Sequence, residues 1–469
     1  MRSTDRLFSV LRKLLPAPFT IAVLLSLFTF FGAFVFTKEE DKGAFAYLYT
    51  LMGYWEGGLW KSSLLVFAVQ MMLMLVLGHV LALTKPVALV IDSFAARCTS
   101  TAKAAYWVTL LTILVSLFNW GLGLIFGAIF ARKVGEFAQA TGRKLNYPLI
   151  GAAGYVGLMV WHGGMSGSAL IKAAEPGNLR QMMEGAWSKK QLAGLPEVLS
   201  FDATVFSGLN LVVTLLLLAV LPLAMYFMGK NDHSEVPQLS KNTFQENPTT
   251  AEQPAVQGAE RLDVSRWFGP VFGLVLLVFV GLKMANLVSE GQSVFRFFVP
   301  NNINLLLLGL GLSFHRNIAT FLKAVDEAIS GAAGILIQFP LYFGIMGLVS
   351  ASGLVNQLAT SLAENASSTS FPVITFFSAG LVNIFVPSGG GQWVIQGPIV
   401  IEAATSLGIP LGKSVLALAY GDQLTNMLQP FWALPLLGIT GLKAKEILPY
   451  TLYLMVIGAV IFIGCLLIF

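Results

Sequence analysis

Long apolar runs, each near the length of a membrane-spanning helix, follow one another along this chain. A helix needs about 20 apolar residues to cross a hydrocarbon core of about 30 Å, because each residue rises about 1.5 Å. Runs of that length predict spans near 14–36, 62–83, 147–171, 204–228, 267–288, 331–350, 412–440 and 447–469. A shorter run at 302–314, joined to an amphipathic helix around 316–330, predicts one more span. The pattern predicts an all-α polytopic membrane protein.

Two further apolar stretches, about 103–137 and about 371–404, are interrupted near their centres by Gly, Asn or Pro, which are weak helix formers. Basic residues collect in cytoplasmic loops. Basic clusters that we place in the cytoplasm lie before and after the first stretch, at Lys85, Arg97, Lys103, Arg132, Lys133, Arg143 and Lys144. We therefore expect 103–137 to be a re-entrant hairpin, with the N-terminus cytoplasmic. Continued along the chain, the same count places a second hairpin, 371–404, on the outer face.

The composition excludes a soluble domain. Hydrophobic residues make up 56% of the 469 residues and charged residues only 11%, whereas soluble domains carry about a quarter charged residues. The net charge of +5 comes from scattered basic residues, which excludes a nucleic-acid surface and suits basic cytoplasmic loops. Cys98 and Cys465 lie far apart without metal-ligand spacing, so we expect both to be small apolar packing residues.

A polar segment divides the chain almost equally. Residues 230–266 are rich in Pro, Gln, Glu, Asn and Ser and lack apolar periodicity, which is typical of a linker. We place this linker in the cytoplasm between a first half, 1–229, and a second half, 267–469. A second mixed segment, 176–203, predicts one or two extracytoplasmic surface helices, with a functional lid as the alternative.

The two halves match at a constant offset of 264 residues (383 − 119 = 264). The offset pairs Asn119 with Asn383, Gly127 with Gly391, Gly157 with Gly421, and His162 with Asn426. Each half thus has a broken hairpin followed by a broken helix, at about 147–171 and about 412–440. Interrupted helices in inverted halves are typical of the binding site of a secondary transporter, because irregular backbone at membrane depth needs protein or water around it. Chance similarity of Gly-rich membrane segments is the alternative.

A hairpin tip offers groups that bind small ions, because it ends one helix and begins another. The free N-terminal amides suit an anion, and glycine lets a ligand approach the backbone. The indole ring at the second tip can wall the apolar part of a substrate. Candidate substrate-binding residues are Ser388, Gly389, Gly390, Gly391, Gln392 and Trp393 at that tip, and His162, Gly163, Gly164, Ser166, Thr425 and Asn426 opposite it.

The free C-terminal carbonyls and side-chain oxygens of the breaks suit a hard cation such as Na⁺. Candidate cation-binding residues are Asn119, Gly121, Asn383, Pro387 and Asp422. The alternatives are structural: the two asparagines could cap half-helices, and Asp422 could be a buried cap. His162 could contact substrate, couple a proton, or make a structural hydrogen bond. No other metal and no cofactor are expected.

Three segments of this chain resemble a known family. They are "VPSGGGQWVIQGP" at 386–398, "FNWGLGLIFGAIFARKVG" at 118–135 and "GDQLTNMLQPFWALPLLGI" at 421–439. They are similar to recurring segments of the bacterial short-chain fatty acid transporter family, which resembles the wider ion transporter superfamily. The resemblance implies two re-entrant hairpins, a scaffold and a transport domain, a homodimer and an elevator-like movement. It also implies symport of short monocarboxylates such as acetoacetate or butyrate with Na⁺ or H⁺ across the inner membrane.

One departure from the superfamily leaves the coupling ion open. Its better-known members carry Ser-Asn-Thr at both tips, whereas here the tips read Phe-Asn-Trp at 118–120 and Val-Asn-Ile at 382–384. The absence of Lys and Arg from both tips favours a substrate with a single carboxylate. Our hypothesis is a secondary active transporter, with a transporter or exporter of another organic anion, or a passive channel, as alternatives. An intramembrane enzyme is disfavoured, because the chain has no HExxH motif, no nucleophile-and-base motif and no paired aspartates.

Overall fold

The computed structural model describes residues 16–38, 43–184, 187–231, 258–291, 297–363 and 366–469, and every regular element in these ranges is a helix. The main helices before residue 232 are α2 (Pro18–Phe36), α3 (Ala44–Leu59), α4 (Ser62–Ala82), α5 (Lys85–Ala95), α6 (Thr101–Phe118), α7 (Trp120–Ala140), α8 (Tyr147–Tyr155), η1 (Val156–Met159), η2 (Trp161–Gly163), α9 (Ser168–Ala173), α10 (Asn178–Met183), α11 (Lys189–Gly194) and α12 (Gly208–Lys230). Those after residue 257 are α13 (Phe268–Ser289), α14 (Pro300–Phe314), α15 (Ile318–Ile329), α16 (Ala333–Ala351), α17 (Leu354–Ala363), α18 (Phe371–Phe385), α19 (Gly389–Ser406), α20 (Leu411–Thr425), η8 (Asn426–Leu428), α21 (Pro430–Thr440) and α22 (Ala444–Ile468).

Six of the eight predicted spans correspond to long apolar helices, whereas 147–171 and 412–440 each form a series of shorter helices. Among the described residues, seven helical segments are long and apolar enough to cross a membrane: Pro18–Phe36, Ser62–Ala82, Thr101–Phe118, Gly208–Lys230, Phe268–Ser289, Ile318–Ala351 and Ala444–Ile468. The shorter run at 302–314 is α14, and the amphipathic segment is α15. Most of the predicted linker, 230–266, and the basic N-terminal residues lie outside the described residues. Cys98 and Cys465 are both free and buried, as expected for packing residues.

Helix α3 is a helix that the apolar pattern of the sequence does not predict. Its sequence, AFAYLYTLMGYWEGGL, is only 16 residues long and is diluted by three glycines and a glutamate, so it lacks the signal of a span. The helix forms because it packs against α16, where Gly58 lies directly on the backbone of Phe343. Tertiary contact therefore stabilises a helix whose composition alone does not predict it.

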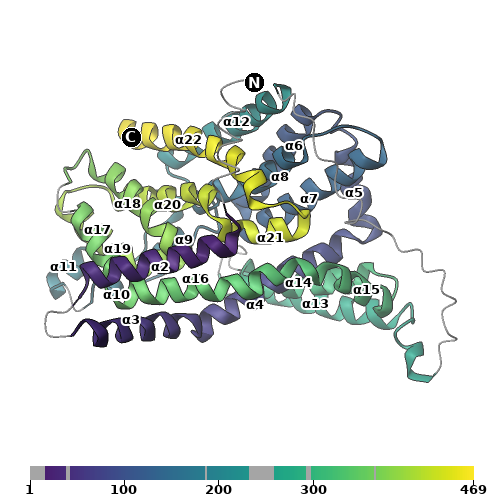
Figure 1. Ribbon diagram of the computed structural model, residues 1–469, viewed down its shortest axis with the longest axis horizontal. Helices are drawn as coiled ribbons and strands as arrows, with labels where there is room; N and C mark the ends of the chain where they lie inside the picture. The colour runs from purple at the N-terminus through teal and green to yellow at the C-terminus, as the bar shows by residue number, and fades with distance from the viewer. Residues whose placement is uncertain (1–15, 39–42, 185–186, 232–257, 292–296, 364–365) are drawn as a thin grey trace.

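The helices form two layers (Figure 1). We call the helices along the lower side of the view, α3, α4, α13, α14, α15 and α16, together with α2, which packs on α16, the lower layer. The upper layer contains α6, α7, α8, α12, α18, α20 and α22. Helix α21 connects the layers, since it packs against α7 and α16.

Each interrupted stretch folds back on itself. Helices α6 and α7 meet at Asn119 and lie so close that Gly123 contacts the side chain of Ser116. Helices α18 and α19 meet at residues 386–388, and the Gln392 side chain of α19 donates a hydrogen bond to the Ala379 carbonyl of α18 at 2.8 Å. Both stretches are therefore helical hairpins, with their tips at the predicted breaks.

The bases of the two hairpins lie at opposite ends of α12. Gly229, near the end of α12, contacts Ala102 at the base of the first hairpin. Ala203, just before α12 begins, contacts Gly412, which follows the base of the second hairpin. A helix of 23 residues is about 35 Å long. The hairpins therefore enter the upper layer from opposite directions.

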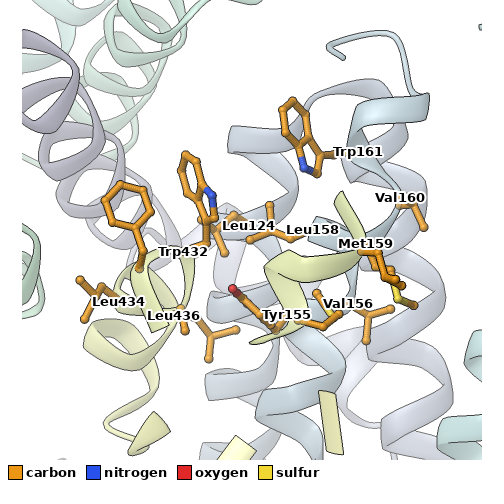
Figure 2. Packing of buried hydrophobic residues seen from close by; sticks show 14 of the residues in the cluster. Leu124, Tyr155, Val156, Leu158, Met159, Val160, Trp161, Trp432, Leu434 and Leu436 are labelled. Atoms are coloured by element: carbon orange, nitrogen blue, oxygen red, sulfur yellow. The ribbon is translucent and has the colours of Figure 1, made fainter. Parts of the chain in front are cut away.

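The two broken helices cross where they are broken. The Tyr155 hydroxyl donates to the Asn426 carbonyl at 2.9 Å, and the Asn426 amide donates to the Leu158 carbonyl at 3.2 Å. Apolar side chains from both halves surround the crossing, among them Leu158 and Trp432 (Figure 2). Each break thus satisfies backbone groups of the other, which irregular backbone in an apolar interior requires.

Candidate functional site

The tip of the second hairpin presents two unpaired backbone donors. Ser388 is the N-cap of α19, and its hydroxyl accepts from the Gly391 amide at 3.2 Å. The Gln392 amide donates to the Ser388 carbonyl at 2.7 Å. The amides of Gly389 and Gly390 have no hydrogen-bond partner among the described residues. They lie at the positive end of an 18-residue helix and are therefore suited to an anion.

This tip rests on the first break. A Cβ atom added to Gly389 would lie 2.7 Å from Cε1 of His162 and 3.0 Å from Cη2 of Trp161, both closer than real Cβ contacts. At Gly390 the nearest atom would be Cβ of Ser168 at 3.9 Å, an ordinary contact. Glycine at 389 is thus what allows the start of α19 to touch the first half of the chain.

His162 is fully buried and faces Asp422 from the other half. The Ala169 amide donates to Nε2 of His162 at 3.0 Å, so in the neutral ring the proton sits on Nδ1. Nδ1 lies 3.3 Å from Oδ1 of Asp422 without forming a hydrogen bond, and Oδ2 of Asp422 has no partner. Around this pair, the amides of His162 and Gly163 both donate to Oε1 of Gln423, at 2.9 and 3.1 Å.

Asn383 joins the second hairpin to the second break. Its Nδ2 lies 2.7 Å from the Asp422 carbonyl and 3.0 Å from both Oγ1 of Thr425 and Oδ1 of Asn426. The Gln429 side chain donates to the Asn383 carbonyl. Asn383 lies inside α18 and is therefore a cross-link between helices rather than a cap.

Several buried side-chain oxygens near this junction accept no hydrogen bond. Buried polar atoms in folded proteins are nearly always paired, and oxygen ligands are those that hard cations prefer. The unpaired oxygens are Oδ1 of Asn383, Oδ2 of Asp422, Oε1 of Gln392 and Oε1 of Gln429. The second tip and second break thus offer acceptors for a cation or a proton.

The first tip is arranged differently from the second. Asn119 is the N-cap of α7: its Oδ1 accepts from the Leu122 amide at 3.0 Å, and its Nδ2 donates to the Phe298 carbonyl at 3.0 Å. The Trp120 amide donates to the Ser166 hydroxyl at 2.9 Å. Both polar atoms of Asn119 are therefore engaged within the fold, which is the capping arrangement. Gly121 lies beside Met74 of α4.

The first break lies between both tips. Gly164 contacts the Leu117 carbonyl at the first tip, whereas His162 contacts Gly389 at the second. Pro387 is buried in the second turn, and the buried Trp393 directs its indole N–H to Oδ1 of Asn178 at 3.3 Å. The structure thus brings the candidates of the second tip together with both breaks, and leaves Asn119 and Gly121 on the other side of the first break.

Two contributors to this site, Gln423 and Trp161, are not among the candidate residues named individually from the sequence. Gln423 pairs the amides of the first break, and Trp161 contacts the second tip. Both adjoin residues that were singled out, Asp422 and His162. The sequence feature that could have indicated them is a polar or aromatic residue next to a break. Their role, however, depends on contact between the two halves.

The fold and the site together define the class. Interrupted helices that meet at buried, partly unpaired polar groups inside an apolar helical protein are the architecture of a membrane transporter. The whole chain, residues 1–469, matches the family described as "Short chain fatty acid transporter". The chain belongs to this family, and it is a transporter rather than an enzyme.

Two relatives extend over nearly the full chain. A protein of Escherichia coli (strain K12), named provisionally as a short-chain fatty acid transporter, is 36% identical over 450 residues, covering 96% of this chain and 95% of that protein. A protein of Haemophilus influenzae with the same name is 35% identical over 453 residues, covering 96% of each chain.

Solved structures show more distant likenesses. The Alcanivorax borkumensis YdaH transporter has a TM-score of 0.43 at 15% identity, covering 96% of this chain and 98% of that one. Neisseria gonorrhoeae MtrF has a TM-score of 0.42 at 12% identity, covering 99% of this chain and 97% of that one.

Proposed function

We propose that the protein is a secondary active transporter that takes up short-chain fatty acids or related monocarboxylates, such as acetoacetate and butyrate. One observation carries this proposal. The second tip, which has two unpaired amides, contacts the first break at His162. A single carboxylate can accept from both amides of Gly389 and Gly390. The tips and breaks contain no Lys or Arg, which suits one negative charge better than two.

The coupling ion is Na⁺ or H⁺, and each has a chemical basis at the second break. The unpaired oxygens of Asn383, Asp422 and Gln429 are hard ligands suited to Na⁺. The buried His162–Asp422 pair is suited to carrying a proton, because imidazole and carboxylate groups exchange protons readily. Experiment can distinguish coupling to Na⁺ from coupling to H⁺, because the two gradients can be imposed independently.

We also propose that the two hairpins are re-entrant and that the halves form an inverted repeat. Support comes from the order of elements, a hairpin, a broken helix and a long helix in each half, and from hairpin bases at opposite ends of α12. In this proposal the upper layer is the transport domain, and it moves against the lower layer as a scaffold, in an elevator-like cycle. The protein would be a homodimer in the bacterial inner membrane, with its N-terminus cytoplasmic.

The test is uptake of labelled acetoacetate or butyrate into proteoliposomes, with Na⁺ and H⁺ gradients imposed separately. Accumulation above equilibrium under one gradient is expected, and it would identify the coupling ion. Equilibration without accumulation would indicate a passive channel. No flux from protein shown to be folded would discard short-chain substrates and favour another organic anion or export.

A further inference from the structure

Trp161 carries a buried hydrogen-bond donor that nothing in the described residues satisfies. Its side chain is 4% exposed, and its indole Nε1 has no hydrogen-bond partner. An N–H removed from water without an acceptor is unfavourable, and such groups in folded proteins are few. The indole N–H of Trp161 is therefore free to donate to an acceptor from outside the chain.

The indole lies at the place where a carboxylate would bind. Its six-membered ring contacts Gly389, since Cη2 would lie 3.0 Å from a Cβ atom there. The unpaired amides of Gly389 and Gly390 follow directly along the chain. The residue that carries the unpaired indole N–H thus contacts the residue that carries the first unpaired backbone amide of α19.

Aromatic rings surround this donor and make an apolar wall. The Trp161 ring stacks on His162 with centroids 4.4 Å apart and lies 5.8 Å from Trp120. Trp120 in turn lies 5.2 Å from Trp432 and 6.3 Å from Phe67 of α4. Figure 2 shows the indoles of Trp161 and Trp432 near Leu124 and Leu158. These surroundings are apolar like a short acyl chain, and the indole N–H is a polar group that a purely hydrocarbon chain leaves unpaired.

We propose that Trp161 recognises an oxygen on the acyl chain and that the preferred substrates are short oxo acids. The carboxylate accepts from the Gly389 and Gly390 amides, and the keto oxygen accepts from Nε1 of Trp161. This inference rests on the proposed transport of short monocarboxylates and adds the substrate class. A plain fatty acid of equal length is discriminated against, because a site that binds a polar atom rejects an analogue that lacks it.

Trp55 provides a matched comparison. Its Nε1 is also buried without a partner, but it lies in α3 against Gly344 of α16, in the lower layer. The same chemical change, loss of an unpaired indole N–H, can therefore be made at both positions. Only at Trp161 are free backbone amides adjacent.

The experiment measures how well unlabelled acetoacetate and unlabelled butyrate compete with labelled butyrate for uptake into proteoliposomes. Wild type, Trp161→Phe and Trp55→Phe are compared, each first shown to be folded by its thermal unfolding. We expect wild type to prefer acetoacetate by about 10-fold or more. Trp161→Phe should lower that ratio to within about 3-fold through weaker acetoacetate competition, while Trp55→Phe keeps the wild-type ratio.

An unchanged ratio in Trp161→Phe would overturn the role of Trp161, as would equal competition by both acids in wild type. In either case butyrate uptake itself would still support the proposed function. Absence of uptake and of competition in folded wild type would overturn both proposals together. If Trp161→Phe fails to fold, the proposal is tested on the wild-type protein alone. Acetoacetate must then compete better than butyrate, and better than pentanoate, which is longer but lacks the keto oxygen.

Discussion

At the scale of single residues, the site depends on positions where the residue type decides whether two segments can meet. Gly389 is such a position, because its backbone lies against His162 and Trp161. Asn383 is another, because its amide nitrogen faces three oxygens of the second break. In both cases the residue type follows from what the other segment presents.

Replacing Gly389 with alanine should lower uptake by about 10-fold or more, because the new Cβ forces the tip away from His162. The matched control is Gly464→Ala in α22, where nothing lies within 4 Å of the added Cβ and uptake should be retained. Uptake is measured in proteoliposomes at equal protein content. A wild-type uptake rate for Gly389→Ala would show that transport does not require the contact between the second tip and His162.

The two asparagines that the 264-residue offset pairs, Asn119 and Asn383, should respond differently to Asn→Asp substitution. Asn383→Asp places a carboxylate among three buried oxygens and should lower the free energy of unfolding by about 3 kcal/mol. Asn119→Asp keeps the oxygen that caps α7 and loses only the bond to Phe298, so it should cost about 1 kcal/mol. Denaturant unfolding in detergent checks both, and equal losses would contradict the structural difference between the tips.

At the scale of elements, glycines determine which helices can lie side by side. Helix α3 reaches α16 because Gly58 and Gly347 lie against each other. In the upper layer, Gly127 of α7 and Gly154 of α8 touch backbone to backbone. Where lipid offers no hydrophobic drive for association, such close backbone approach supplies the packing energy between helices.

Two adjacent glycines in α3 give a clean comparison. Gly58→Ala drives a methyl group into the Phe343 carbonyl of α16 and should lower the free energy of unfolding by about 2 kcal/mol. At Gly57 nothing lies within 4 Å of an added Cβ, so Gly57→Ala should be neutral or stabilise the helix by up to about 1 kcal/mol. Thermal unfolding in detergent measures both, and a tolerated Gly58→Ala would mean that α3 is not held on α16 in this way.

At the scale of the whole molecule, the two layers touch at the first tip. Phe118 at the end of α6 packs on Phe298, which precedes α14, with ring centroids 4.5 Å apart. Asn119 donates to the carbonyl of the same Phe298. If the upper layer slides against the lower layer, these contacts must break in each transport cycle.

Linking the layers at this point should therefore stop transport. In a Cys98→Ala, Cys465→Ala background, Phe118→Cys with Phe298→Cys is joined by a short bis-maleimide, and uptake should fall to background. The control links Gln70→Cys of α4 to Asn301→Cys of α14, two lower-layer residues whose side chains hydrogen-bond at 2.8 Å, and uptake should persist. Full uptake with the layers linked would argue against their relative movement.

Much of the architecture could be predicted from the sequence. The apolar runs predicted α2, α4, α12, α13, α16 and α22 to within a few residues, and the Gly, Asn and Pro positions predicted where helices break. Helix α3 escaped prediction because a 16-residue segment with three glycines and a glutamate forms a helix only when α16 covers it. The composition of a segment determines its free energy of transfer from water to lipid, but it does not determine which helices pack against each other.

The sequence by itself determined the membrane class, the order of helices and the positions of the breaks, because transfer of apolar side chains and helix propensity are local properties. Only the tertiary structure decided what each break contacts. It made Asn119 a cap and Asn383 a cross-link although the 264-residue offset in the sequence pairs them. It also placed His162 beside Asp422 and Trp161 beside Gly389, pairs more than 200 residues apart, because such contacts depend on how two chain segments cross.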